Sequence, residues 1–365
     1  MGVWFSASAV APLLAAEWRL GPSGGAWLTM AVQLGFVAGT LLSALLNLAD
    51  RLPSRWFFSS SALLAGASTL AIARVSHGPE SALPLRCATG FFLAGVYPVG
   101  MRIMATWTKA NRGFGIGLVV GALTLGTAAP HLLRHWLGAR DWRGILTQAS
   151  ILALAGAFVA VLLRDGPYGA ARPRFEWSYA LSLFRRRDVL LANLGYLGHM
   201  WELYAMWAWL PVFLAVEFGL RASLMAFWAI AAGAVGCVWA GRLADRFGRP
   251  EVTSAAMILS GSCALLAGAA AGSWLAVVSV VWGFSVVADS AQFSASVTEF
   301  CEARYTGTAL TLQTCLGFVL TLATIRLVPA VQAQWGSRAA LAMLAVGPAL
   351  GTLAMLRLRR GVQVR

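Results

Sequence analysis

The sequence predicts an all-α membrane protein, a bundle of about twelve transmembrane helices, and three observations lead to this fold class. Of the 365 residues, 59% are hydrophobic and only 12% are charged, whereas soluble domains carry about a quarter charged residues. The mean hydropathy is +0.72. Apolar runs close to the roughly 20 residues that cross a bilayer recur along the chain, and most charged residues fall between these runs.

Twelve apolar segments qualify as spans. In chain order they are Gly2 to Ala16, Gly25 to Leu48, Trp56 to Val75, Ala82 to Trp107, Gly113 to Leu137, Gly144 to Leu163, Val189 to Ala215, Ala222 to Leu243, Val252 to Ala271, Trp274 to Val297, Thr306 to Ala330 and Arg338 to Leu356. The first span has about fifteen residues, or roughly 22 Å of helix, against a hydrocarbon core of about 30 Å. It also lacks the features of a signal peptide, so we expect Met1 to lie inside a longer helix, through either a misassigned start or a truncation.

One segment between spans is much longer than the others. Residues 164–188 carry six arginines, two prolines and two glycines, which predicts a cytoplasmic linker between six-helix halves at 1–163 and 189–365. With the linker inside, 18 of the 28 basic residues fall on the cytoplasmic side, 7 on the other side and 3 within spans. Because cytoplasmic loops retain Lys and Arg, we expect both termini in the cytoplasm and the protein in the inner membrane.

An internal repeat supports two equivalent halves. Asp50-Arg51 follows the second span and Asp245-Arg246 follows the eighth, 195 residues later. The sequence from Arg112 to Gly115 resembles that from Arg304 to Gly307, 192 residues later. Offsets that agree this closely indicate parallel repeats of six spans, an arrangement found in large transporters.

One loop carries a specific motif. Residues 241–250 read Gly-Arg-Leu-Ala-Asp-Arg-Phe-Gly-Arg-Pro, which resembles the signature G-x-x-x-D-R-x-G-R-[KR] of the major facilitator superfamily and departs from it only at Pro250. The glycines permit close helix approach and a tight turn, and the acid can pair with an arginine or a helix N-terminus. We therefore expect a conformational latch formed by Gly241, Asp245, Arg246, Gly248 and Arg249. The first-half copy is eroded but keeps Asp50 and Arg51; an ordinary basic loop is the alternative for both copies.

The resemblance implies a secondary transporter that works by alternating access, without a cofactor and without enzymatic activity. Arg86 to Gly90 resembles the superfamily's intramembrane R-x-x-x-G motif, and the fifth span carries Gly113, Gly117 and Gly121 before Pro130. As a whole, the chain resembles the nitrate, nitrite and cyanate permease branch. Nitrate porters are expected to carry arginines within their second and eighth spans, however, and here the second span has none.

Polar residues inside spans are candidates for the substrate or proton site, since burying them in a bilayer is costly. In the seventh span, Tyr196, His199, Glu202 and Trp209 share one helical face, which we expect to line a central cavity. A buried pair of His199 with Glu202 is the structural alternative. The other candidates are Asp289 and Gln292 in the tenth span and Arg86 and Tyr97 in the fourth, where the alternatives are interhelical hydrogen bonds for Asp289 and snorkelling for Arg86.

The leading hypothesis is a proton-coupled or facilitated transporter of a small solute, organic or anionic. A multidrug exporter, a non-transporting receptor and a membrane-embedded enzyme are the alternatives, and the last lacks a Ser/His/Asp grouping or a Walker A sequence. The net charge of +14 does not indicate nucleic-acid binding, because the basic residues are not clustered on a soluble face. The five cysteines show no metal-ligand spacing, so we expect no metal. The expected partners are the lipid bilayer, the solute and protons, and we expect a monomer.

Overall fold

The computed structural model describes residues 1–108, 112–138, 141–168, 176, 179, 185–302 and 305–363, without the side chains of residues 22, 23, 50, 112, 362 and 363. Within these described residues, the first half of the chain consists of helices and their connections. In chain order they are α1 (Gly2–Ala9), α2 (Ala11–Glu17), α3 (Pro22–Leu45), α4 (Leu48–Arg51), α5 (Ser54–Val75), α6 (Pro79–Leu93), α7 (Tyr97–Trp107), α8 (Arg112–Leu137) and α9 (Trp142–Ala160).

The second half repeats this all-helical pattern. Its helices are α11 (Arg187–Phe218), α12 (Ala222–Phe247), α13 (Arg249–Ala267), α14 (Gly272–Val286), α15 (Ser290–Phe300), α16 (Thr306–Ala342) and α17 (Val346–Gln363), with short 3-10 turns at Gly219–Arg221 and Met343–Ala345. Gly219, with φ +50°, lies at the turn between α11 and α12, and Gly336, with φ +81°, interrupts α16. Glycine adopts these left-handed conformations without the steric penalty of a β-carbon.

Nine helical stretches in the described part of the chain are long and apolar enough to cross a membrane. Two of them, Arg187–Phe247 and Thr306–Gly361, include the turns at Gly219 and Gly336, so each holds two of the predicted spans. The first predicted span is not among the nine and is divided at Val10 into α1 and α2.

The fourth and tenth predicted spans are both found, and each consists of two helices separated by a short turn. Residues 94–96 separate α6 from α7, and residues 287–289 separate α14 from α15. Pro98 lies in the first turn of α7, where proline is tolerated because its missing N–H would be unpaired there in any case. Hydropathy detects the apolar run but not such a local break.

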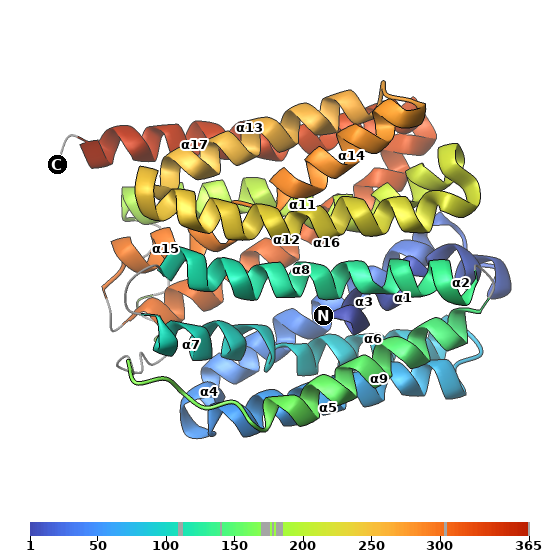
Figure 1. The fold of residues 1–365 in the computed structure, drawn as a ribbon, viewed down its shortest axis with the longest axis horizontal. Coiled ribbons are helices and arrows are strands. Elements are labelled where there is room, and N and C mark those ends of the chain that lie inside the picture. The colour runs from blue at the N-terminus through green and yellow to red at the C-terminus, as the bar shows by residue number, and fades with distance from the viewer. Residues whose placement is uncertain are drawn as a thin grey trace.

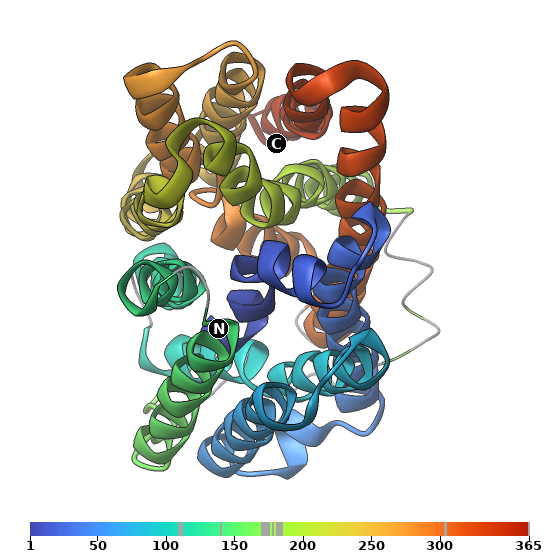
Figure 2. The ribbon, with the colours of Figure 1, turned by 90° about the vertical axis from the view of Figure 1, so that its right-hand side faces the viewer.

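The helices run roughly along the longest axis of the molecule, with α1–α9 on one side and α11–α17 on the other (Figure 1). Figure 2, viewed toward the end of the bundle that carries α2, separates the two groups in the same way. We call this end the pocket end, because Leu20 and Gly21, which line the cavity described below, lie there. We call the opposite end the latch end, because it carries Asp245 of the predicted latch. The helix pairs α8 with α12 and α3 with α16 form contacts between the two groups.

The same close helix contact occurs in both groups. A β-carbon on Gly90 of α6 would lie only 1.8 Å from the carbonyl oxygen of Val32 on α3, and one on Gly283 of α14 would lie 1.6 Å from that of Ala229 on α12. Only glycine allows backbones to approach this closely. Gly90 and Gly283 are 193 residues apart, which agrees with the offset of the sequence repeat.

Candidate functional site

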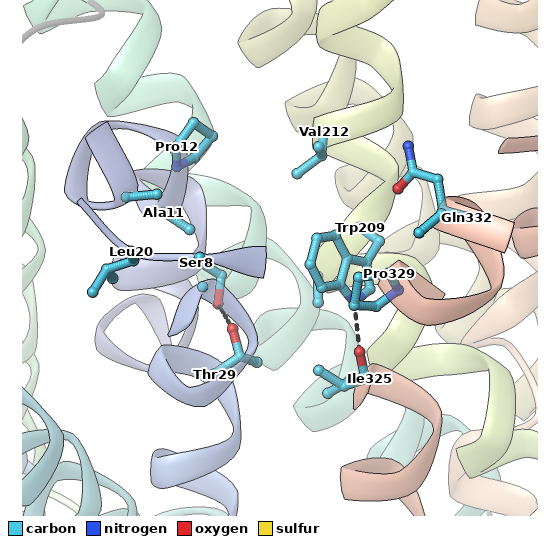
Figure 3. Close-up of a pocket in the computed structure, with 15 residues that line it drawn as sticks. Ser8, Ala11, Pro12, Leu20, Thr29, Trp209, Val212, Ile325, Pro329 and Gln332 are labelled. Atoms are coloured by element: carbon cyan, nitrogen blue, oxygen red, sulfur yellow. Dashed lines mark hydrogen bonds between the residues drawn. The ribbon is translucent and has the colours of Figure 1, made fainter. Parts of the chain in front are cut away.

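A cavity of about 650 Å³ lies between α1–α3 and the helices α11 and α16 at the pocket end. Figure 3 shows Ser8, Ala11 and Pro12 facing Trp209 and Val212 across it. Its described lining is Ser8, Ala11, Pro12, Ala15, Leu20, Gly21, Gly25, Thr29, Ala208, Trp209, Val212, Ile325, Pro329, Gln332 and Ala333. None of these residues is charged, and most are apolar.

The few polar groups of the lining bond within their own side of the cavity. The hydroxyl oxygens of Ser8 and Thr29 are 2.6 Å apart, which joins α1 to α3. The Trp209 Nε1–H donates to the carbonyl oxygen of Ile325 over 3.1 Å, which joins α11 to α16 (Figure 3). Trp209 therefore lies at the predicted cavity, and its ring forms part of the wall.

Six aromatic side chains pack together within about two helical turns of lining residues on the same helices, and we call them the aromatic floor. Ring centroids are 5.0 Å apart for Trp4 and Phe36, 4.6 Å for Phe36 and Phe318, and 5.5 Å for Phe5 and Trp207. The floor joins both groups of helices and consists of Trp4, Phe5, Phe36, Tyr204, Trp207 and Phe318. Beside it, the Thr321 hydroxyl donates to Gln33 Oε1 over 2.9 Å.

Glu202 lies inside the second group of helices rather than at the cavity. Its side chain is buried, and its two carboxylate oxygens each accept one hydrogen bond. The Ser260 hydroxyl of α13 donates to Oε2 over 2.8 Å, and the Trp282 Nε1–H of α14 donates to Oε1 over 2.7 Å. Glu202 is thus held by two neutral donors, and the sequence analysis did not anticipate either of them.

His199 is paired with Asp289 instead of Glu202, which corrects the pairing considered from the sequence. His199 Nδ1 lies 2.8 Å from Asp289 Oδ1, and both side chains are buried. Asp289 occupies the break between α14 and α15, where the helical backbone is interrupted beside α11. Tyr196 packs near His199, with ring centroids 6.2 Å apart.

The predicted common face of the seventh span is therefore divided between two environments. Trp209 lines the cavity, whereas His199 and Glu202 contact α13, α14 and the α14–α15 break. The reason is that α11 is buried on nearly all sides between Val189 and Leu214. For a helix that is apolar all round, periodicity does not identify which neighbour each face contacts.

Gln292 lies one turn beyond Asp289 and contacts the latch end. Its Oε1 accepts from Arg249 Nη1 over 2.7 Å, and Arg249 Nε donates to Glu299 Oε1 over 2.7 Å. The motif arginine thus connects the start of α13 to α15. This places Gln292 with the motif residues rather than at the cavity.

Arg86 is fully buried and directs its guanidinium to backbone carbonyls. Its Nε donates to the Leu28 oxygen over 3.0 Å and its Nη1 to the Val3 oxygen over 2.8 Å, while Nη2 donates to the Trp4 oxygen. These bonds hold α1 and α3 against α6 and use the fork of donors that arginine provides. Tyr97, at the start of α7, is partly buried against the main core.

Asp245 contacts the N-terminus of α8 at the latch end. Its two carboxylate oxygens accept the backbone N–H groups of Gly113 and Phe114, each over 3.2 Å. Helix N-termini expose unpaired N–H groups and favour negative charge. The Arg242 guanidinium lies 4.4 Å from the centre of the Phe114 ring. This contact joins the first group of helices to the second.

Close packing surrounds this contact. A β-carbon on Gly241 would lie 2.3 Å from the Gly113 carbonyl oxygen, and one on Gly117 would lie 2.6 Å from that of Cys237. Gly248 has φ +101° at the turn from α12 to α13. Arg246 is exposed, and its guanidinium lies 5.1 Å from the Phe247 ring centre.

The first-half copy of the motif is only partly described. Arg51 is exposed at the end of α4. The side chain of Asp50 lies outside the described part of the structure, as do residue 304 and the side chain of Arg112. The expectation that Asp50 forms a second latch therefore stays a prediction.

Two groups of helices that enclose a cavity at one end and meet through a helix terminus at the other are the arrangement expected of a secondary membrane transporter. The sequence profile of the Major Facilitator Superfamily matches residues 1–324. The chain belongs to this superfamily. The predicted fold class, the superfamily and the absence of an enzymatic role are confirmed.

The relatives are distant. A probable L-galactonate transporter of Escherichia coli (strain K12) is 25% identical over 200 residues, which cover 48% of this chain and only 44% of that protein. The solved structure of the E. coli fucose:proton symporter has a TM-score of 0.67 at 13% identity, and that of the nucleoside transporter NupG has 0.73 at 14%. Each of these two alignments covers 98% of this chain and 96% of the solved chain. At these identities the likeness shows the fold alone.

Proposed function

We propose that this transporter moves a small organic solute by alternating access in a proton-coupled cycle, with Glu202 as the coupling acid. The observation that carries the proposal is the buried carboxylate of Glu202, whose two donors, Ser260 and Trp282, are both neutral. An ionised carboxylate in a dry interior is costly unless it is paired, and binding a proton removes that cost. Glu202 is therefore suited to exchange a proton as its surroundings change between conformations.

The buried pair of His199 and Asp289 is a second candidate for proton exchange. It lies on α11 one turn from Glu202 and at the break between α14 and α15. A break in a helix is a place where the two segments can shift relative to each other. In the proposed cycle, movement at this break alters the environment of both acids.

The contact of Asp245 with α8 serves in the proposal as the latch of one conformer. The cavity lies toward the pocket end, while Asp245 joins the two groups of helices at the opposite end. Breaking the two hydrogen bonds to Gly113 and Phe114 would allow the latch end to open. The superfamily motif and this geometry both support that role.

An organic solute is favoured over an inorganic anion such as nitrate. The relatives are named for fucose, nucleosides and L-galactonate, and no described residue of the cavity lining is charged. The sequence of α3 contains no arginine, unlike that expected of a nitrate porter. A volume of about 650 Å³ falls within the range of typical small-molecule sites.

Uptake into proteoliposomes with an imposed pH gradient tests the coupling role. Glu202→Gln keeps the shape of the side chain but fixes its charge at zero, so we expect loss of accumulation against a gradient and retention of solute exchange. The matched control is Glu80→Gln at the exposed start of α6, which should accumulate solute like the wild type. Normal pH-driven accumulation by Glu202→Gln would exclude Glu202 as the coupling acid and leave Asp289 to be tested.

A multidrug exporter is the second candidate, and the apolar cavity lining with its aromatic floor favours it. The same proteoliposomes separate the two functions. Export of hydrophobic dyes or drugs without accumulation of sugars, sugar acids or nucleosides would support the exporter, and the opposite result would support the first proposal.

A further inference from the structure

We infer that the solute is electrically neutral and rich in oxygen acceptors, and that it binds against the aromatic floor through N–H donors of Trp4, Trp207 and Gln33. This inference rests on the proposed transport function and names the substrate class for the same cavity. It replaces the anion considered from the sequence.

The floor and the adjacent Gln33 carry buried donors that have no protein partner in the described part of the chain. They are the Trp4 Nε1–H, the Trp207 Nε1–H and the Gln33 Nε2 amide group. All three side chains are at most 1% exposed. Leaving a buried donor unpaired is costly, so three unpaired donors in one cluster point to a site that a ligand completes.

These donors come from both groups of helices and belong to one cluster. Trp4 lies on α1 and Trp207 on α11, and both rings contact Phe5 and Tyr204. Gln33 lies one turn from Phe36 on α3, and the Phe36 ring contacts Trp4. A solute bound by all three would touch both groups of helices, as alternating access requires.

The floor lies directly below the cavity. The lining residues Ser8 and Ala208 lie within about one helical turn of a floor residue on the same helix. The lining residues Thr29 and Ile325 lie about one turn from Gln33 and Thr321, respectively. Separation of α3 from α16 at that pair would extend the cavity onto the rings. The solute would then leave the upper cavity and reach the donors.

Charge excludes an anion from this place. The lining contains no charged residue among those described. Arg86, buried on the α1 side, is already bonded to three backbone carbonyls, and Arg134 of α8, which reaches α1, donates to the Ala9 carbonyl oxygen over 2.7 Å. Arg19 and Arg326, which adjoin lining residues in the chain, are exposed. A buried anion without a paired cation is strongly disfavoured, whereas carbonyl, ether and hydroxyl oxygens accept N–H groups without that cost.

The rings complete the description of the solute. Aromatic faces offer a large apolar surface at little entropic cost, which fits the flat apolar face of a sugar ring or a nucleobase. Gln313, deeper on α16, adds a buried amide with an unpaired donor and an unpaired acceptor. The site therefore matches a neutral sugar or nucleoside better than the corresponding acid or phosphate.

Binding to the purified full-length protein in detergent tests the inference without a proton gradient. The probes are two matched pairs, L-galactose with L-galactonate and uridine with uridine monophosphate, and the readout is ligand-induced thermal stabilisation with the derived Kd. We expect the neutral member of at least one pair to bind at least about 10-fold more tightly. An acid or phosphate that binds as tightly as its neutral partner would overturn the inference.

The variants Trp4→Phe and Trp207→Phe keep an aromatic ring and remove one donor. Each should weaken binding of the neutral probe about 10-fold, the effect of one lost hydrogen bond at the upper end of the usual range. Each should also reduce the preference of the wild type for the intact probe over a deoxy analogue that lacks one oxygen. The control is Trp274→Phe, 57% exposed on α14, which should bind like the wild type.

Two further outcomes distinguish this inference from the proposed function. If neither variant changes the preference for intact over deoxy probes, the donors do not bind the solute, whatever the transport assays give. If none of the four probes binds while the proteoliposomes still accumulate another solute, the inference fails and the transport function stands. Loss of the coupling role of Glu202, in contrast, leaves the ratio of neutral to acidic binding unchanged.

Discussion

At the scale of single residues, the buried polar groups of this transporter divide into those with protein partners and those without. Arg86 and Glu202 are held by neutral backbone or side-chain groups. His199 and Asp289 form the one pair of opposite acid–base character buried within the described helices. Among the unpaired donors of the described residues, those of Trp4, Trp207 and Gln33 lie at or beside the aromatic floor. Partnered groups fix the helices, whereas the unpaired donors beside the floor are the ones proposed to bind the solute.

The pair of His199 and Asp289 predicts strong energetic coupling. Removing one partner of a buried pair leaves the other without compensation, at a cost of about 3–5 kcal/mol. We expect His199→Phe and Asp289→Leu each to lower the thermal unfolding temperature of the purified protein. The double variant should be more stable than the sum of the two losses implies, because the uncompensated group is then absent.

Thermal unfolding of the wild type, both single variants and the double variant measures this coupling. Asp289→Asn is a useful comparison, since it keeps a polar group at the helix break without the charge. Additive losses within about 0.5 kcal/mol would indicate independent residues and contradict the pairing.

At the scale of helices, α8 and α12 form a contact that extends from the latch into the bundle. Gly113 and Gly117 of α8 lie against the backbone of Gly241 and Cys237 on α12, and Asp245 closes the end of this interface. Small residues at a spacing of four on one helix allow such close packing. The helix pair is therefore tight at the latch end, where the motif is located.

The latch predicts a shift in conformational population for Asp245→Asn. The substitution removes the charge that the N-terminus of α8 stabilises, and we expect it to disfavour the conformer with the cavity open by about 1–3 kcal/mol, the usual range of coupling between sites. The measurement uses the variant Ala11→Cys, whose new cysteine lies in the cavity lining, in a protein from which the five native cysteines have been replaced. Its reaction with maleimide should slow several-fold.

The control for this experiment is Glu80→Gln at the exposed start of α6. Labelling of Ala11→Cys should be unchanged by it. If Asp245→Asn also leaves the labelling rate and transport unchanged, the motif serves only as a basic loop that sets the orientation of the chain.

How much of the molecule the sequence predicts differs between elements. The apolar runs predict the spans from the second to the twelfth to within a few residues, because hydropathy depends only on neighbouring residues. The motif predicts that Asp245 meets a helix N-terminus or an arginine, but not that the helix is α8 of the other group. Pairings such as Glu202 with Trp282 join residues 80 positions apart, and one sequence contains no signal for them. For the same reason, the sequence does not identify which of its 16 tryptophans and 18 phenylalanines form the aromatic floor.

At the scale of the whole molecule, the two groups of helices meet in two unlike regions. Toward the latch end they are joined by backbone contacts and by Asp245. At mid-height they are joined by the aromatic floor and by Gln33 with Thr321, and beyond it they diverge around the cavity. Aromatic rings in contact are easier to separate than closely packed helix backbones. The floor is therefore the part of the interface that a solute can enter.

The orientation of this arrangement in the membrane is the last prediction. Cytoplasmic loops retain arginine, and residues 164–188, with six arginines, connect α9 to α11, so we expect this segment and the latch end to face the cytoplasm and the cavity to open toward the opposite side. In intact cells, a membrane-impermeant maleimide should label Gly21→Cys at the cavity and not Phe247→Cys at the latch end, again without the native cysteines. Inside-out vesicles should give the reverse pattern. Labelling of Phe247→Cys in intact cells would invert the orientation and place the cavity on the cytoplasmic side, and solute would then enter the described conformer from within the cell.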